Sequence, residues 1–114
     1  MITYWHNPRC SKSRAGLALL QENGAQVEQR LYLTDAPSAD EISAARKALG
    51  QPPVIEMMRT GEKLFKELGL SKTDDDATLV AAMAAHPILI ERPLAISGDR
   101  AVIGRPPERV LELL

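Results

Sequence analysis

The sequence predicts an α/β fold: a four-stranded mixed sheet with a helical insert between its two halves. Strand, helix and strand patterns open the chain within roughly 30 residues, which is the size of a βαβ unit with parallel strands. Near the end, two short β patterns flank a two-residue turn and precede a helix signal, giving a ββα unit. From about residue 38 to about residue 86 only helical patterns appear.

Length and composition favour one domain that spans residues 1–114. Fourteen Lys and Arg against fifteen Asp and Glu leave a net charge of -1, so the broad basic surface of a nucleic-acid binder is excluded. The longest apolar run has seven residues, from Leu79 to Ala85, which is too short for a membrane span. The first residues lack the pattern of a signal peptide, and we expect a cytoplasmic protein.

The opening βαβ unit is predicted from three patterns. Residues 1–5 combine β-branched and aromatic side chains and form a short strand that ends at Asn7. Residues 11–23 have helical apolar spacing, and Gly24 supplies the left-handed stop. Residues 26–33 alternate weakly and suit a second strand at the edge of the sheet.

The insert is predicted to contain four short helices. Ser38 and Glu41 have the spacing of a capping box, and that helix stops at Gly50. Two prolines can open a short helix that reaches residue 58, and a third helix around residues 64–68 stops at Gly69. Thr73 and Asp76 repeat the capping spacing before a helix that ends at His86.

The closing unit is a hairpin followed by a helix. Residues 94–97 and 100–103 pair across Gly98 and Asp99, and prolines at 106 and 107 start a final helix over residues 108–114. A βαβ unit, a helical insert and a ββα unit in this order are the thioredoxin-like arrangement.

Cys10 is the only cysteine, so no disulfide can form within the chain. The residue falls between a strand-ending loop and a helix that begins near Ser11, where backbone N–H groups and the helix dipole lower a thiol pKa. Arg9, Lys12 and Arg14 are close in sequence and favour the thiolate further. The alternative is a buried cysteine that acts as a small hydrophobic residue. No tetrahedral zinc spacing is present, and we expect no metal.

The run from Cys10 to Ser13 has the spacing of a redox Cys-x-x-Cys motif with serine in the second position, so turnover needs an outside thiol. Ser13 is expected either to donate to the sulfur or a bound oxyanion, or to be an ordinary residue of the first helical turn. His6 either helps to stabilise the thiolate or is a polar residue at a strand end. Arg14 supports the site or belongs to a solvated helix face.

Four segments resemble the glutaredoxin-coupled arsenate reductase family, ArsC, and in particular a short subgroup of it. They occur in the family's order and the likeness runs essentially end to end. The segments are His-Asn-Pro-Arg-Cys-Ser-Lys-Ser-Arg at 6–14, Met-Met-Arg at 57–59, His-Pro-Ile-Leu-Ile-Glu-Arg-Pro at 86–93, and Ile-Gly-Arg-Pro-Pro-Glu at 103–108.

The resemblance implies a thioredoxin-like fold with a helical insert, and it implies the site residues. Cys10 is then the nucleophile, and Arg59, Arg92 and Arg105 surround the oxyanion. Pro93 matches the cis proline of thioredoxin-like folds. Guanidinium groups offer paired donors to the oxygens of such an anion. Longer members of the family continue past the helix that ends this chain.

The resemblance also implies the reaction. An arsenate reductase would form a thiolate–arsenate adduct on Cys10, resolved by glutathione as co-substrate and by glutaredoxin as partner, with no bound cofactor. We also expect a monomer. Two alternatives remain open at this point. One is a Spx-like regulator that binds RNA polymerase, and the other is a glutathione-dependent thiol reductase with a different substrate. Three further arginines are expected to be solvated: Arg46, Arg100 and Arg109.

Overall fold

The computed structural model describes residues 1–114 and contains one four-stranded mixed sheet with the strand order β2-β1-β3-β4. β1 (Ile2–Trp5) pairs in parallel with β2 (Val27–Arg30) and antiparallel with β3 (Leu94–Ser97). β3 pairs antiparallel with β4 (Arg100–Ile103), closing the predicted hairpin. The α/β class, the mixed sheet and the edge position of β2 are confirmed.

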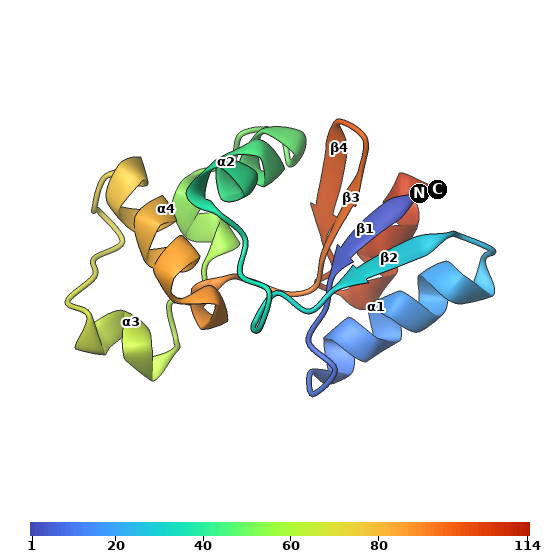
Figure 1. Cartoon of the computed structure of the whole chain (residues 1–114), viewed down its shortest axis with the longest axis horizontal. Helices are drawn as coiled ribbons and strands as arrows, with labels where there is room; N and C mark the ends of the chain where they lie inside the picture. Colours follow the sequence, from blue (N-terminus) through green and yellow to red (C-terminus); the bar gives the residue numbers. More distant parts are fainter.

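The two faces of the sheet carry different apolar side chains because side chains alternate along each strand. Ile2, Tyr4, Ala95 and Val102 share one face and pack with residues of α1 (Ser11–Glu22) and of the 3₁₀ helix η3 (Pro107–Leu113). Figure 1 shows α1 and the C-terminal helix together on this side of the sheet.

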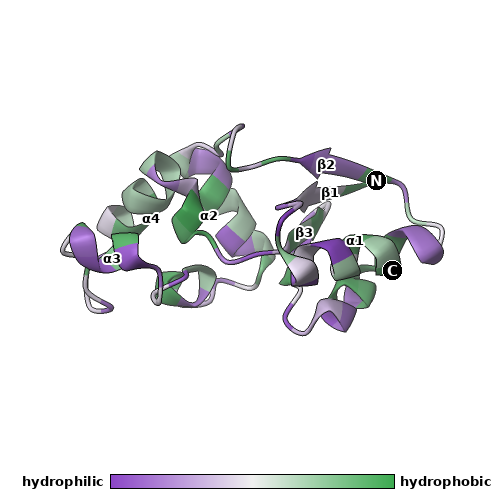
Figure 2. Ribbon diagram, turned by 90° about the horizontal axis from the view of Figure 1, so that it is seen from below, coloured by the Kyte–Doolittle hydropathy of each residue, from purple (hydrophilic) through white to green (hydrophobic).

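The helical insert lies beside the sheet and has its own core, which Trp5, Leu94 and Ala101 of the other face of the sheet join (Figures 1 and 2). It contains α2 (Ala39–Ala48), η1 (Val54–Met57), α3 (Lys63–Glu67), α4 (Asp76–Ala85) and η2 (Pro87–Leu89). Fifteen buried residues join the insert to the sheet. No helix in the chain is both long and apolar enough to cross a membrane.

The N-terminus of α2, which carries a capping box, is joined to the sheet by an ion pair. The Ser38 hydroxyl accepts from the Glu41 backbone N–H at 3.1 Å, and the Glu41 carboxylate accepts from the Ser38 backbone N–H at 3.0 Å. The predicted capping box is therefore confirmed. Arg30 at the end of β2 pairs with the same carboxylate. The Arg30 guanidinium and the Ser38 N–H lower the pKa of Glu41 to about 2.

Two local predictions were wrong. The second strand stops at Arg30 instead of residue 33, because the backbone turns: Thr34 and Asp35 both donate to the Leu31 carbonyl. The cap of α4 is Asp75, whose carboxylate accepts from the Thr78 N–H at 2.8 Å. A carboxylate is a strong N-cap acceptor, and the expected box of Thr73 and Asp76 does not form.

The prediction of solvated arginines is confirmed for Arg100 and Arg109, which are exposed, and is wrong for Arg46, whose side chain is only 18% exposed. Arg46 donates to the Pro52 carbonyl at 2.7 Å and pairs with Asp76 at 3.1 Å, joining α2 to α4. Arg100 donates to the Glu112 carbonyl, and Arg109 pairs with the carboxylate of the same residue. The partners of Arg46 and Arg100 come from other elements, which sequence spacing does not reveal, whereas Arg109 and Glu112 lie three residues apart in η3.

The start of α1 is held against the sheet by a close approach at Gly16. A Cβ atom at this position would lie 2.5 Å from the Tyr4 hydroxyl, so only glycine leaves the space. The same hydroxyl donates to the Ser13 carbonyl at 2.7 Å and fixes the first turn of the helix. Burial raises the pKa of Tyr4, which keeps the phenol protonated as a donor.

Candidate active site

Cys10 is the N-cap residue of α1, at the end of the loop that leaves β1. Its backbone N–H donates to the Asn7 carbonyl at 3.0 Å, and its carbonyl accepts the first helical bond, from Arg14, at 3.0 Å. The Asn7 side chain accepts from the Arg9 N–H at 3.1 Å and tightens the same loop. The thiol is partly exposed and free.

The pKa of the Cys10 thiol is lowered from its ordinary value. Burial alone would raise this pKa, but the backbone N–H groups of Ser13 and Lys12 and the Arg92 guanidinium stabilise the thiolate and outweigh it. The first turn of α1 therefore acts on the sulfur as predicted. The cationic side chain that lowers this pKa is Arg92, which is distant in sequence.

His6 and Ser13 form a buried pair behind the cysteine loop. The His6 Nδ1 atom lies 2.7 Å from the Ser13 hydroxyl, which also accepts from the Asn7 N–H at 3.0 Å. Burial, with a smaller contribution from Arg14, lowers the pKa of His6, so the ring is neutral at pH 7. His6 therefore reaches Cys10 through Ser13, whose backbone N–H faces the sulfur. Arg14 is exposed and donates to the Pro8 carbonyl at 2.8 Å.

Arg92 enters the site just before β3. The peptide bond between Arg92 and Pro93 is cis, as the resemblance predicts, and the bond between Arg105 and Pro106 is cis as well. The Pro93 ring fits beside Gly104, where a Cβ atom would lie only 2.7 Å from the ring. Pro93 also lies beside α1, since a Cβ atom at Gly16 would be 3.5 Å from its ring, so the segment that carries Arg92 packs against this helix.

Tyr32 lies behind the arginines and was not predicted as a site residue. The side chain is completely buried, and its hydroxyl has no hydrogen-bond partner. Burial raises the pKa of Tyr32 to about 12, although Arg92 and Arg59 act in the opposite direction. Both arginines and Cys10 are therefore close enough to the phenol to influence it. The turn after Arg30 is what directs Tyr32 inward.

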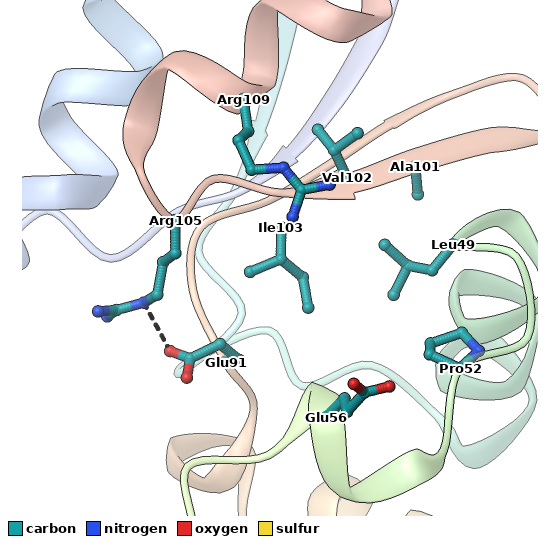
Figure 3. Close-up of a pocket in the computed structure, with 9 residues that line it drawn as sticks. All are labelled: Leu49, Pro52, Glu56, Glu91, Ala101, Val102, Ile103, Arg105 and Arg109. Carbon is teal, nitrogen blue, oxygen red and sulfur yellow. Dashed lines mark ion pairs between the residues drawn. The ribbon is translucent and has the colours of Figure 1, made fainter.

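Arg59 and Arg105 meet at a single carboxylate, that of Glu91. The Glu91 Oε1 atom lies 3.3 Å from Arg59 Nη1 and 2.8 Å from Arg105 Nε. Arg105 Nε also donates to the Arg92 carbonyl at 2.9 Å. A β-bridge between Met58 and Ile90 brings the two chain segments together. Figure 3 shows the Glu91–Arg105 pair, with the end of the arginine turned away from the residues across the cavity.

The cavity in Figure 3 is not the thiol site itself. Its volume is about 400 Å³, and Glu91 and Arg105 form one of its walls, but Cys10 does not line it. The structure thus brings Cys10 together with Arg92, and it links Arg92 to Arg59 and Arg105 through Glu91 and Tyr32. Sequence reasoning missed Glu91, although its position directly before Arg92 was a usable signal.

A cysteine with a lowered pKa at a helix N-terminus, a cis proline before β3 and a mixed four-stranded sheet are features of a thioredoxin-like protein. Comparison with known proteins gives the family. The sequence model of the ArsC family matches residues 5–113, and the chain belongs to the ArsC family.

Individual relatives are similar over nearly their whole length. An arsenate reductase of Haemophilus influenzae is 48% identical over 114 residues, covering 99% of this chain and 98% of the relative. An arsenate reductase of Neisseria meningitidis is 42% identical, covering 99% and 97%. The solved structure of an arsenate reductase from Vibrio cholerae matches with a TM-score of 0.95 and 46% identity, covering 99% of this chain and 97% of that one. The thioredoxin-like fold with a helical insert is confirmed by this match.

Proposed function

We propose that this protein is an arsenate reductase that takes its electrons from glutathione and is regenerated by glutaredoxin. The observation that carries the proposal is the meeting of the Cys10 sulfur with the Arg92 guanidinium and the first-turn N–H groups of α1. The names of the full-length relatives support arsenate as the oxyanion.

In the first step the Cys10 thiolate attacks the arsenic atom of arsenate. A sulfur–arsenic bond forms and one arsenic–oxygen bond breaks, and the departing oxygen leaves as water after taking up protons. Arsenic remains in the pentavalent state. Arg59, Arg92 and Arg105 would hold the remaining oxygens, since charge-assisted contacts are the strongest hydrogen bonds available to such an anion.

In the second step the glutathione thiolate attacks the Cys10 sulfur. A disulfide forms between Cys10 and glutathione, and the pair of electrons of the sulfur–arsenic bond passes to arsenic, which departs as trivalent arsenite. The two thiols are thereby oxidised by two electrons, and arsenic is reduced by two. Attack on sulfur by an outside thiolate is ordinary thiol–disulfide chemistry.

In the third step a glutaredoxin thiolate takes the glutathione, forming its own mixed disulfide and releasing the Cys10 thiolate. An outside thiol is required because the chain has no second cysteine and Ser13 occupies the position of a resolving thiol. The scheme needs no bound cofactor or metal, and it places the protein in the cytoplasm, where thiols are kept reduced.

The test is arsenate-dependent oxidation of NADPH, coupled through glutathione reductase, glutathione and glutaredoxin. The native chain should turn over many times, and Cys10→Ser should fold normally and show no arsenate-dependent rate. Absence of an arsenate-dependent rate in the native chain would contradict the proposal.

A further inference from the structure

All three arginines of the proposed oxyanion pocket make contact with one atom, Oε1 of Glu91. Arg59 Nη1 lies 3.3 Å from it and Arg105 Nε lies 2.8 Å from it. The backbone N–H of Arg92 donates to the same oxygen at 3.1 Å. The Glu91 side chain is only 21% exposed, so these contacts are partly shielded from water.

The contacts occupy the Nε atoms of Arg59 and Arg105 and one terminal nitrogen of Arg59, and they leave the other terminal nitrogens free. Arg105 is held through Nε, and its two terminal nitrogens have no hydrogen-bond partner in the chain. Arg59 is held through Nε by Glu62 at 2.9 Å and through Nη1 by Glu91, which leaves Nη2. The free nitrogens are the donors that an oxyanion could use.

The same contacts reduce the charge of the pocket. Arg59, Arg92 and Arg105 contribute three positive charges, and the carboxylates of Glu62 and Glu91 contribute two negative charges. The thiolate of Cys10 offsets the third positive charge. An incoming oxyanion therefore meets well-placed donors but little net attraction.

The geometry points to Glu91 as a specificity-determining residue: its Oε1 atom holds Arg59 and Arg105 in place, while its charge reduces the preference of the pocket for doubly charged oxyanions over singly charged ones. The inference rests on the oxyanion pocket of the proposed function and adds the charge state of the anion that the pocket takes.

The expected signature follows from the linear dependence of Coulomb energy on charge. Consider a negatively charged group that lies a few ångströms from a bound anion in a water-like dielectric. Removing its charge strengthens the binding of a singly charged anion about threefold. The free-energy gain doubles for a doubly charged anion of the same shape, so its binding should strengthen about tenfold. Glu91→Gln makes this change and retains the Oε1 acceptor.

The experiment measures dissociation constants of sulfate and sulfamate by isothermal titration calorimetry at one pH. Both probes are tetrahedral and unreactive towards the thiol, and they carry two charges and one charge respectively. Glu91→Gln is compared with the native chain and with Glu22→Gln, which makes the same change of net charge at the far end of α1. Sulfate should gain about tenfold and sulfamate about threefold only in Glu91→Gln.

Equal gains for the two anions, or weaker sulfate binding in Glu91→Gln, would overturn the inference and leave Glu91 as a purely structural contact. The outcome for the proposed function is read separately. If the native chain and Glu91→Gln bind neither anion, the oxyanion pocket is wrong and the inference falls with it. If the gains for sulfate and sulfamate differ as expected but no arsenate-dependent rate is found, the oxyanion pocket and the role of Glu91 are supported. Arsenate is then the wrong substrate.

Discussion

At the scale of single residues, the site shows that neighbours in space decide the chemistry of Cys10. The sequence predicted a thiolate stabilised by a helix N-terminus, and the first turn of α1 does face the sulfur. Of the neighbouring arginines, Arg14 points elsewhere, since its guanidinium donates to the Pro8 carbonyl. Arg92 acts on the sulfur instead, because the start of β3 packs beside the start of α1.

The lowered pKa of Cys10 gives the first prediction. A thiol with a lowered pKa becomes nucleophilic at lower pH, so the midpoint of iodoacetamide labelling should lie clearly below the free-cysteine value of about 8.5. Arg92→Ala should shift the midpoint upward, because the guanidinium favours the thiolate. Arg9→Ala should change it less, although Arg9 is the adjacent residue. A native midpoint near 8.5 would contradict this account.

The second prediction concerns the loss of single arginines. Arg59→Ala, Arg92→Ala and Arg105→Ala should each weaken sulfate binding by roughly 1.5–3 kcal/mol, the range for a hydrogen bond to a charged group. The measurement is the calorimetric dissociation constant. Lys72→Ala is the control, since Lys72 is exposed and lies in the insert away from these contacts. Four variants that bind sulfate like the native chain would show that the pocket is misassigned.

Arg46 illustrates what the sequence could not show at this scale. Its hydrogen bond to Pro52 and its ion pair with Asp76 need the packing of α2 on α4, which no local pattern reveals. The position of Glu91 before Arg92 was a usable signal, but its contact with Arg59 depends on the bridge between Met58 and Ile90 and could not be predicted. Residues at loop ends could be predicted as site residues, and their partners could not.

At the scale of elements, local signals were reliable where the cause is local. The Ser38 capping box and the hairpin turn at Gly98 depend only on nearby residues, and both were predicted correctly. The end of β2 was not, because the inward turn of Tyr32 depends on the core it enters. The close packing of α1 on the sheet is a further contact between elements, and Gly16 makes it possible.

The third prediction tests the packing of Gly16 of α1 against Tyr4 of the sheet. Gly16→Ala should lower the free energy of unfolding by about 1–3 kcal/mol, the cost of overpacking a close contact, because its Cβ would meet the Tyr4 hydroxyl. Chemical denaturation measures the change. Adding Tyr4→Phe removes the clashing oxygen, so the double variant should lose less than the sum of the two single variants.

Gly61→Ala provides the matched control, because a Cβ atom at Gly61 meets nothing within 4 Å. Its stability should stay close to that of the native chain. Strict additivity of Gly16→Ala and Tyr4→Phe would show that the two positions do not meet as described.

At the scale of the whole molecule, the order of elements was predictable because each unit carries its own pattern. The βαβ unit, the insert and the ββα unit all appear in the expected order. The assembly of the site was not predictable from pattern alone. Its residues come from the β1–α1 loop, from the insert, and from the segments that enter and leave the hairpin at its open end. Only the resemblance to a family joined Cys10 with Arg59, Arg92 and Arg105 in advance.

The fourth prediction follows from the single cysteine. Its measurement is the most direct test of the central claim, that glutathione resolves an arsenate adduct on Cys10. Intact-protein mass spectrometry is run on the native chain after incubation with arsenate and glutathione, with glutaredoxin absent. The account predicts that a disulfide between Cys10 and glutathione accumulates only when arsenate is present, and that glutaredoxin removes it. An unmodified protein mass, or efficient turnover with thioredoxin and no glutathione, would contradict the account.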